Sequence, residues 1–232
     1  MRIIKLTEDT LQMRKELLEN FELMKTTTGI SGIDNAFGFL VKGSIYAVAS
    51  ATGVGKTTFL LATAKEMANK GYKVLYLSIE MNVEQLIPYL PEIQPNLTVQ
   101  EFDGTSWDKL DGSEYDIICY DYIGANLNDW DELIIEADNL AEYAKKHNIV
   151  IFTALQARPE IAEETKEENL HTNVYVAFSK GMINKVAGAA YLVKRKQHLY
   201  LYVMKNRYGP VNWDPIEMSD LDYATKSWLP RW

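Results

Sequence analysis

A strand, a glycine-rich turn and a helix follow one another without a break near residue 50, and this succession constrains the fold more than any other feature. The apolar run SIYAVAS leads into ATGVGKTTFLLATAKEMA, which has the pattern of an amphipathic helix. Gly53 and Gly55 let the backbone curl so that successive N–H groups point at phosphate oxygens, and the helix N-terminus adds positive potential. The segment therefore predicts a phosphate-binding loop in an α/β protein.

The expected ligand of this loop is ATP with Mg²⁺. The residues expected to cradle the nucleotide are Ser50, Ala51, Thr52, Gly53, Val54, Gly55, Lys56, Thr57 and Thr58. Lys56 is placed to reach the β- and γ-phosphates, and the Thr57 hydroxyl to bind the metal ion. Ser50 stands where the usual GxxxxGK[ST] pattern has its first glycine, and a residue this small still permits the turn. The loop alone specifies nucleotide binding and not hydrolysis.

Strand and helix patterns alternate after the loop, which predicts βαβ units and a mostly parallel, twisted sheet with helices on both faces. The expected strands are residues 44–50, 72–79, 115–120 and 149–155, and the expected helices are residues 56–70, 83–89 and 129–147. The runs AAYLVKRK and HLYLYVMKNR predict antiparallel strands added near the C-terminus. We expect the strand at 115–120 to lie beside the phosphate-loop strand, at the crevice where open α/β sheets bind ligands.

Polar residues end three of these strands. Asp121 follows an apolar run, where an acid has no structural reason to be unless it faces a site or caps a turn, and we expect it to bind Mg²⁺ together with Thr57. Glu80 follows LYLSI and is a candidate for activating the attacking water, although a strand-end acid without a catalytic role is equally open. Gln156 is expected to contact the γ-phosphate.

A pair of cations stands in the segment VMKNRYGP. Lys205 and Arg207 are two residues apart on a predicted strand, so their side chains leave the same face. They suit an anionic partner, or they are exposed charges that oppose strand aggregation.

Charge is unevenly distributed along the chain, whose net charge is -8 and whose isoelectric point is about 5.0. Residues 99–139 hold twelve acids and one base, whereas residues 170–212 hold seven bases and no acid. The second stretch predicts an electropositive surface for the phosphates of a nucleotide or a nucleic acid, or else a solvated face. The single cysteine, Cys119, excludes a disulfide framework, and neither a signal peptide nor a membrane span is evident, so we expect a cytoplasmic protein.

Taken together, these segments resemble the RecA-type ATPase core of DnaB-like replicative helicases, over about residues 28–213. The segments that carry the resemblance follow the family's order: TTTGISGIDNAFGFLVKGSIYAVASATGVGKTTF, SIEMNVEQL, YDYIG, ALQAR, SKGMINKVAGAAYLV and KNRYGP. The resemblance implies catalytic roles within one subunit for Lys56, Thr57, Glu80, Asp121 and Gln156. It further implies that Lys205 and Arg207 reach the γ-phosphate bound by the next subunit of a hexameric ring or spiral.

The resemblance also implies partners. The expected contacts with single-stranded DNA are Ser179, Lys180, Gly181 and Lys185. Replication proteins are further expected partners. The large N-terminal domain of cellular DnaB is absent from this sequence, so we expect a phage-type protein that works in the bacterial host cytoplasm.

Three segments are expected along the chain: an N-terminal linker helix in residues 1–27, the RecA-like ATPase domain in residues 28–215 and a C-terminal tail in residues 216–232. The helix pattern itself covers residues 7–24 and is followed by TTTGISGID, which is typical of a linker. The helix either folds back on its own domain or packs on a neighbouring copy, and the resemblance favours the second.

Three functions remain open at this stage. The first is an ATP-driven helicase motor on single-stranded DNA. The second is a RecA- or RadA-like ATPase for recombination or strand annealing, and the third is an ATP-gated loader or interaction module.

Overall fold

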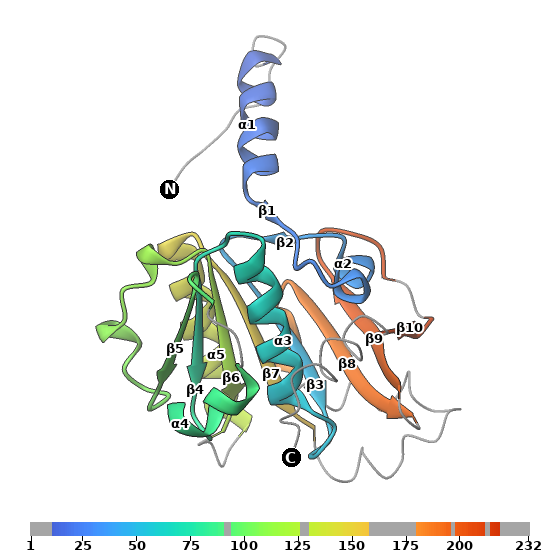
Figure 1. Ribbon diagram of the computed structural model, residues 1–232. Coiled ribbons are helices and arrows are strands. Elements are labelled where there is room, and N and C mark those ends of the chain that lie inside the picture. The colour runs from blue at the N-terminus through green and yellow to red at the C-terminus, as the bar shows by residue number, and fades with distance from the viewer. Residues whose placement is uncertain are drawn as a thin grey trace.

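A sheet of eight strands runs through the molecule in the order β10-β9-β8-β3-β7-β6-β4-β5 (Figure 1). The computed structural model describes residues 11–90, 94–125, 130–157, 180–195, 198–211 and 214–218. The strands are β3 (Ser44–Ser50), β4 (Val74–Ser78), β5 (Leu97–Glu101), β6 (Ile117–Ile123), β7 (Val150–Gln156), β8 (Gly188–Arg195), β9 (His198–Asn206) and β10 (Ile216–Glu217). From β5 to β8 neighbouring strands are parallel. The two runs near the C-terminus form β8 and β9, which pair antiparallel with each other as predicted, but β8 joins the sheet parallel to β3. Strand β10, in the expected C-terminal tail, pairs antiparallel with β9.

Helices cover both faces of the sheet. The helix α3 (Lys56–Asn69) packs on one face, and α5 (Trp130–His147) packs on the other together with the short α8 (Lys180–Lys185). Because both faces are covered, β3 and β6 are buried at every position, which explains their nearly continuous apolar sequences. Shorter helical pieces between the strands are α4 (Val83–Leu86) and the 3₁₀ turns η2 (Ile87–Tyr89), η3 (Trp107–Lys109) and η4 (Gly112–Glu114). The predicted α/β, RecA-like fold class is confirmed.

One expectation about neighbouring strands is wrong. The strand that ends near Asp121 does not lie beside the phosphate-loop strand, because β7 lies between β6 and β3. Ser50 at the end of β3 pairs in register with Gln156 at the end of β7. Apolar patterns reveal that strands are buried but carry no information on which buried strands are adjacent, so this order had to come from packing.

The expected linker after the first helix is partly ordered as α2 (Ser31–Phe37). The Asp34 carboxylate accepts hydrogen bonds from the backbone N–H groups of Thr28 and Gly29 at 2.7 and 3.1 Å. Ile33 and Phe37 are at most 1% exposed. These buried side chains and the local hydrogen bonds fold a segment whose small polar residues are typical of a flexible connection.

The helix α1 (Leu11–Leu23) projects away from the rest of the chain (Figure 1). It is joined to the body by β1 (Lys25–Thr26), which pairs with β2 (Leu40–Val41). Near the end of α1, Phe21 packs on Tyr208 with ring centroids 6.1 Å apart. The Leu18 and Leu23 side chains are 55% and 78% exposed, so these two apolar residues of the helix are not buried against their own domain.

The expected C-terminal tail, residues 216–232, begins with a strand of the sheet. Strand β10 pairs with β9, and Met218, which follows β10, is buried next to Gly32. Residues 219–232 lie outside the described part of the chain, as does the acidic run at 160–168. Within the described residues, no helix is both long enough and apolar enough to cross a membrane.

Candidate active site

The predicted phosphate-binding loop lies at the carboxyl end of β3 and leads directly into α3. Gly53 and Gly55 have φ values of 78° and 109°, which a residue with a side chain rarely adopts. Gly55 is the N-cap of α3, and no side chain of the described residues caps that helix. The backbone N–H groups of the first helical turn therefore face the loop, as binding of a phosphate requires.

The predicted cradle residues extend from the last residue of β3 through the loop into the first turn of α3. They are Ser50, Ala51, Thr52, Gly53, Val54, Gly55, Lys56, Thr57 and Thr58. Ser50 is fully buried, and its Oγ donates to the carbonyl oxygen of Ala51 at 3.1 Å, so the serine closes the turn locally.

Asp121 lies in β6 and is only 2% exposed. Its Oδ2 accepts a 2.6 Å hydrogen bond from the Tyr76 hydroxyl of β4, whereas the buried Oδ1 has no hydrogen-bond partner among the described residues. Burial raises the pKa of Asp121, although the neighbouring hydroxyl groups of Tyr76 and Thr57 oppose this effect. A buried carboxylate oxygen without a partner, close to the Thr57 hydroxyl, fits the oxygen ligands that Mg²⁺ prefers.

Lys56 and Glu80 approach the same place. Burial lowers the pKa of Lys56, while the negative charges of Glu80 and Asp121 counteract this effect. Glu80 follows the end of β4, where Ser78 pairs with Asp121 in register, and its side chain is exposed. The parallel register thus brings the predicted lysine and the two predicted acids to one edge of the sheet.

Gln156 ends β7 at the same edge with an exposed side chain. Its Oε1 accepts a hydrogen bond from the Tyr122 hydroxyl at 3.1 Å. Sequence reasoning identified Gln156 but missed Tyr76 and Tyr122, because a tyrosine in an apolar strand has the pattern of an ordinary core residue.

Lys205 and Arg207 lie at the opposite edge of the sheet, where the parallel strands begin rather than end. The backbone N–H of Arg207 donates to the carbonyl of Ala187, whose own N–H donates to Ile45 near the start of β3. From Ile45 to Ser50 the strand rises about 16 Å, at roughly 3.3 Å per residue. Both cations point toward α8, on the face of α5 and away from α3. The two cations therefore do not join the other predicted catalytic residues within one chain.

The predicted DNA contacts are only partly described. Ser179 lies outside the described residues, and the side chain of Lys180 is likewise not described. Gly181 lies against α5. A Cβ atom added at Gly181 would clash with Ile134 Cδ1, so the close packing requires a glycine here. Lys185 forms a 2.6 Å ion pair with Asp138 of α5.

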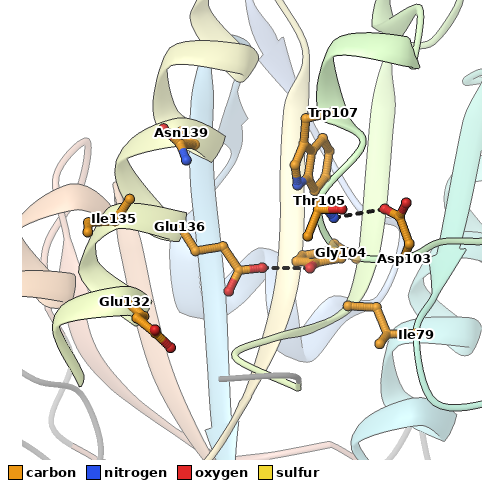
Figure 2. A pocket seen from close by; sticks show the side chains of 10 residues that line it. Ile79, Asp103, Gly104, Thr105, Trp107, Glu132, Ile135, Glu136 and Asn139 are labelled. Atoms are coloured by element: carbon orange, nitrogen blue, oxygen red, sulfur yellow. Dashed lines mark hydrogen bonds between the residues drawn. The ribbon is translucent and has the colours of Figure 1, made fainter. Parts of the chain in front are cut away.

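A pocket of about 510 Å³ lies on the other face of the same edge, between α5 and the loop that follows β5 (Figure 2). Its wall includes Ile79 and Tyr120, the residues directly before Glu80 and Asp121. Glu136 of α5 accepts hydrogen bonds from the Tyr120 hydroxyl at 2.6 Å and from the backbone N–H of Gly124 at 2.9 Å. This carboxylate therefore ties α5 to the end of β6 behind the candidate active site.

Comparison with known sequences finds relatives for part of the chain. The family model of the DnaB-like helicase C terminal domain matches residues 26–113. The DNA repair protein RadA of Aquifex aeolicus is 44% identical over 69 residues, which are 29% of this chain and 15% of that protein. The RadA protein of Helicobacter pylori is 37% identical over 70 residues, which are 30% of this chain and 16% of that protein. The matches thus span less than a fifth of the length of these relatives.

Solved structures resemble a larger share of the chain. One solved ATPase domain superimposes with a TM-score of 0.71 at 16% identity and covers 95% of this chain and 98% of that one. A DnaB-like replicative helicase, studied with its interactions with primase, gives 0.69 at 15% identity and covers 93% of this chain and 64% of that one. The KaiC-like protein PH0186 of Pyrococcus horikoshii gives 0.62 at 14% identity, with coverages of 82% and 92%. At these identities the likeness shows the fold.

Proposed function

Because the chain carries a DnaB-like, RecA-type helicase core, we propose that it is an ATP-hydrolysing motor that moves on single-stranded DNA during DNA replication. In this proposal several copies form a hexameric ring or spiral. The observation that carries it is the separation of the predicted catalytic groups. Lys56, Asp121 and Glu80 gather at one edge of the sheet, and Arg207 lies at the other edge.

Within one subunit the proposed reaction uses the groups at the carboxyl edge. The loop amides and Lys56 hold the phosphates of ATP, and Gln156 contacts the γ-phosphate. Thr57 and Asp121 hold Mg²⁺, which, when bound, neutralises charge on the β- and γ-phosphates. Glu80 accepts a proton from the water that attacks the γ-phosphorus. The bond between the γ-phosphorus and the β,γ-bridging oxygen breaks, so that ADP leaves with that oxygen and inorganic phosphate is formed.

The two distant cations complete the site across an interface. Lys205 and Arg207 of one copy approach the γ-phosphate bound by the next copy and stabilise the charge of the transition state. Cations supplied in this way accelerate phosphoryl transfer by about 10³ to 10⁵. Hydrolysis then depends on assembly, and the exposed apolar residues of α1 support a second contact between copies.

The first experiment measures ATP hydrolysis with and without a single-stranded oligonucleotide, together with the mass in solution in the presence of ATP and Mg²⁺. We expect a multimer, hydrolysis stimulated by the oligonucleotide, and loss of hydrolysis in Lys56→Ala. A chain that stays monomeric while hydrolysing ATP at full rate would contradict the interfacial site.

The RadA matches favour a second candidate function, strand annealing or recombination driven by the same chemistry. A forked duplex and a pair of complementary single strands, tested in parallel, separate the two candidates. Unwinding of the fork supports the helicase motor, and annealing without unwinding supports the alternative.

A further inference from the structure

Tyr122 occupies a position that regular strand geometry would not provide. In a regular strand successive side chains point to opposite faces of the sheet. The pairing of β6 with β7 shifts its register between Tyr120 and Ile123, so the strand is irregular over this stretch. Asp121 bonds to Tyr76 and Tyr122 packs in the same core layer, on the face covered by α3. Two consecutive side chains therefore reach the candidate active site.

Three of the predicted catalytic side chains surround the Tyr122 phenol. Its hydroxyl donates to Gln156 Oε1 at 3.1 Å, and Lys56 Nζ lies 5.4 Å from the centre of its ring. The phenol is 7% exposed. A phenol carries its own proton, and Gln156 Oε1 can only accept, so the Tyr122 hydroxyl is the donor of this hydrogen bond.

A hydrogen bond to the amide oxygen determines which group of a glutamine side chain, the oxygen or the NH₂ group, faces a ligand. The amide of Gln156 has an oxygen that only accepts and an NH₂ group that only donates. A phosphate is an anion and needs donors. With Oε1 held by the Tyr122 hydroxyl, the NH₂ group is left for an acceptor on the other side, whereas the flipped amide would turn its oxygen toward the phosphate.

We propose that Tyr122 is a positioning residue, whose hydroxyl orients the Gln156 amide so that its N–H groups face the γ-phosphate. This inference rests on the proposed function of the ATP site and adds a residue to it. Tyr122 acts through Gln156, and its effect is confined to ligands that carry a γ-phosphate. ADP, which lacks that group, gains nothing from the orientation.

The test compares binding of ADP with binding of a non-hydrolysable ATP analogue in Tyr122→Phe. The phenylalanine keeps the ring beside Lys56 and removes only the hydroxyl. We expect the affinity for ADP to stay within about twofold and the preference for the analogue over ADP to fall about tenfold, as for loss of one hydrogen bond to a charged group. In turnover, kcat should fall more than KM rises.

Two further variants make the result specific. Gln156→Ala changes an exposed side chain and should lower the preference by the same factor, and the double variant should lose nothing more. Tyr120→Phe is the matched control, because its hydroxyl donates to Glu136 on the opposite face, and it should keep the full preference. Thermal unfolding checks that each variant folds.

Several outcomes would overturn the inference. They are an unchanged preference in Tyr122→Phe, an unchanged preference in Gln156→Ala, or losses that add in the double variant. The binding measurement needs no hydrolysis, so its failure is distinct from failure of the proposed function, which would show as absent ATP turnover or as full turnover in Lys56→Ala.

Discussion

Arg207 binds the C-terminal end of α8, because its Nη2 donates to the carbonyl oxygen of Asn184 at 3.2 Å. Lys205 makes the same kind of contact with the carbonyl of Ile183 at 2.5 Å. Carbonyl groups at the end of a helix lack partners within the helix and attract cations. Lys205 and Arg207 are thus both held by one short helix, which begins directly after Ser179, a predicted DNA contact. A displacement of α8 would therefore move the side chains of both Lys205 and Arg207.

Arg207→Ala should abolish most ATP hydrolysis while ATP binding persists. The substitution leaves the phosphate loop of its own chain intact and removes a cation from the neighbour's site. We expect kcat to fall by about 10³ or more. Steady-state hydrolysis and binding of a fluorescent ATP analogue measure the two properties separately.

Mixing two inactive variants tests whether the site is shared between copies. Glu80→Gln lacks the predicted base but keeps the cations, and Arg207→Ala has the opposite defect. A mixed assembly contains some interfaces with both groups intact, so part of the hydrolysis should return. If no ratio of the two variants restores activity, the groups do not act across an interface.

Asp121→Asn should remove hydrolysis and stabilise the fold at neutral pH. Because burial raises the pKa of Asp121, the folded state binds more protons than the unfolded state between the ordinary aspartate pKa and the raised value. The free energy of unfolding of the parent protein therefore falls as the pH rises through this window. In the Asp121→Asn variant residue 121 is uncharged at every pH, so its free energy of unfolding does not fall for this reason. We expect a gain of about 1 kcal/mol at neutral pH, as for other buried charges that are incompletely compensated.

Urea denaturation at acidic and neutral pH measures this gain, which should shrink at acidic pH. Asp116→Asn is the control of opposite sign. Burial opposes the shift at Asp116, but hydrogen bonds from Lys42 and from the backbone N–H of Lys73 lower its pKa. Its asparagine variant should lose stability at neutral pH and approach the parent as the pH falls. An equal gain for Asp121→Asn at both pH values would refute the assigned cause.

Lys185 offers a direct test of the DNA surface. It is paired with Asp138 at 2.6 Å, and both side chains are partly exposed, so the pair itself contributes about 0–1 kcal/mol to stability. If Lys185 contacts a DNA phosphate, Lys185→Ala should weaken oligonucleotide binding and reduce its salt dependence, whereas Asp138→Ala should strengthen binding. Binding titrations over a range of salt concentrations distinguish the two effects. Equal behaviour of both variants would remove Lys185 from the DNA surface.

Leu18→Ser combined with Leu23→Ser should weaken assembly without destabilising the monomer. Both side chains are exposed, so the free energy of unfolding should change by less than about 0.5 kcal/mol for each substitution. Sedimentation velocity with ATP and Mg²⁺ measures the assembly. Glu19→Ser with Asn20→Ser, on the same helix, is the matched control and should assemble normally. A double leucine variant that assembles like the control would show that α1 makes no contact between copies.

The phosphate loop could be predicted because its chemistry is local. Gly53, Gly55 and Lys56 are neighbours in the sequence, and the turn they form depends on their own backbone freedom and on the helix that follows. The strands around the loop were predicted equally well from their apolar runs. The segment before β3 was misjudged, since its composition is that of a linker and the Asp34 hydrogen bonds that order it carry no periodic signal.

Residues that act through contacts between distant segments of the chain could not be predicted from the sequence. Tyr76 holds Asp121 from another strand, and its position was visible only once the register of β4 and β6 was known. Tyr122 lies beyond the strand expected at residues 115–120, and its contact with Gln156 of β7 became visible only with the observed pairing of β6 and β7.

From the order of residues alone came the α/β class, the glycine-rich turn between β3 and α3 and the identities of the strand-end acids, because these depend on side chains within a few positions of one another. The folded molecule added the insertion of β7 between β3 and β6, and the location of Arg207 at the edge opposite Lys56. Such features result from packing between segments far apart in the chain. Many strand orders would bury the same apolar runs. Which order forms depends on how all of the core side chains pack together.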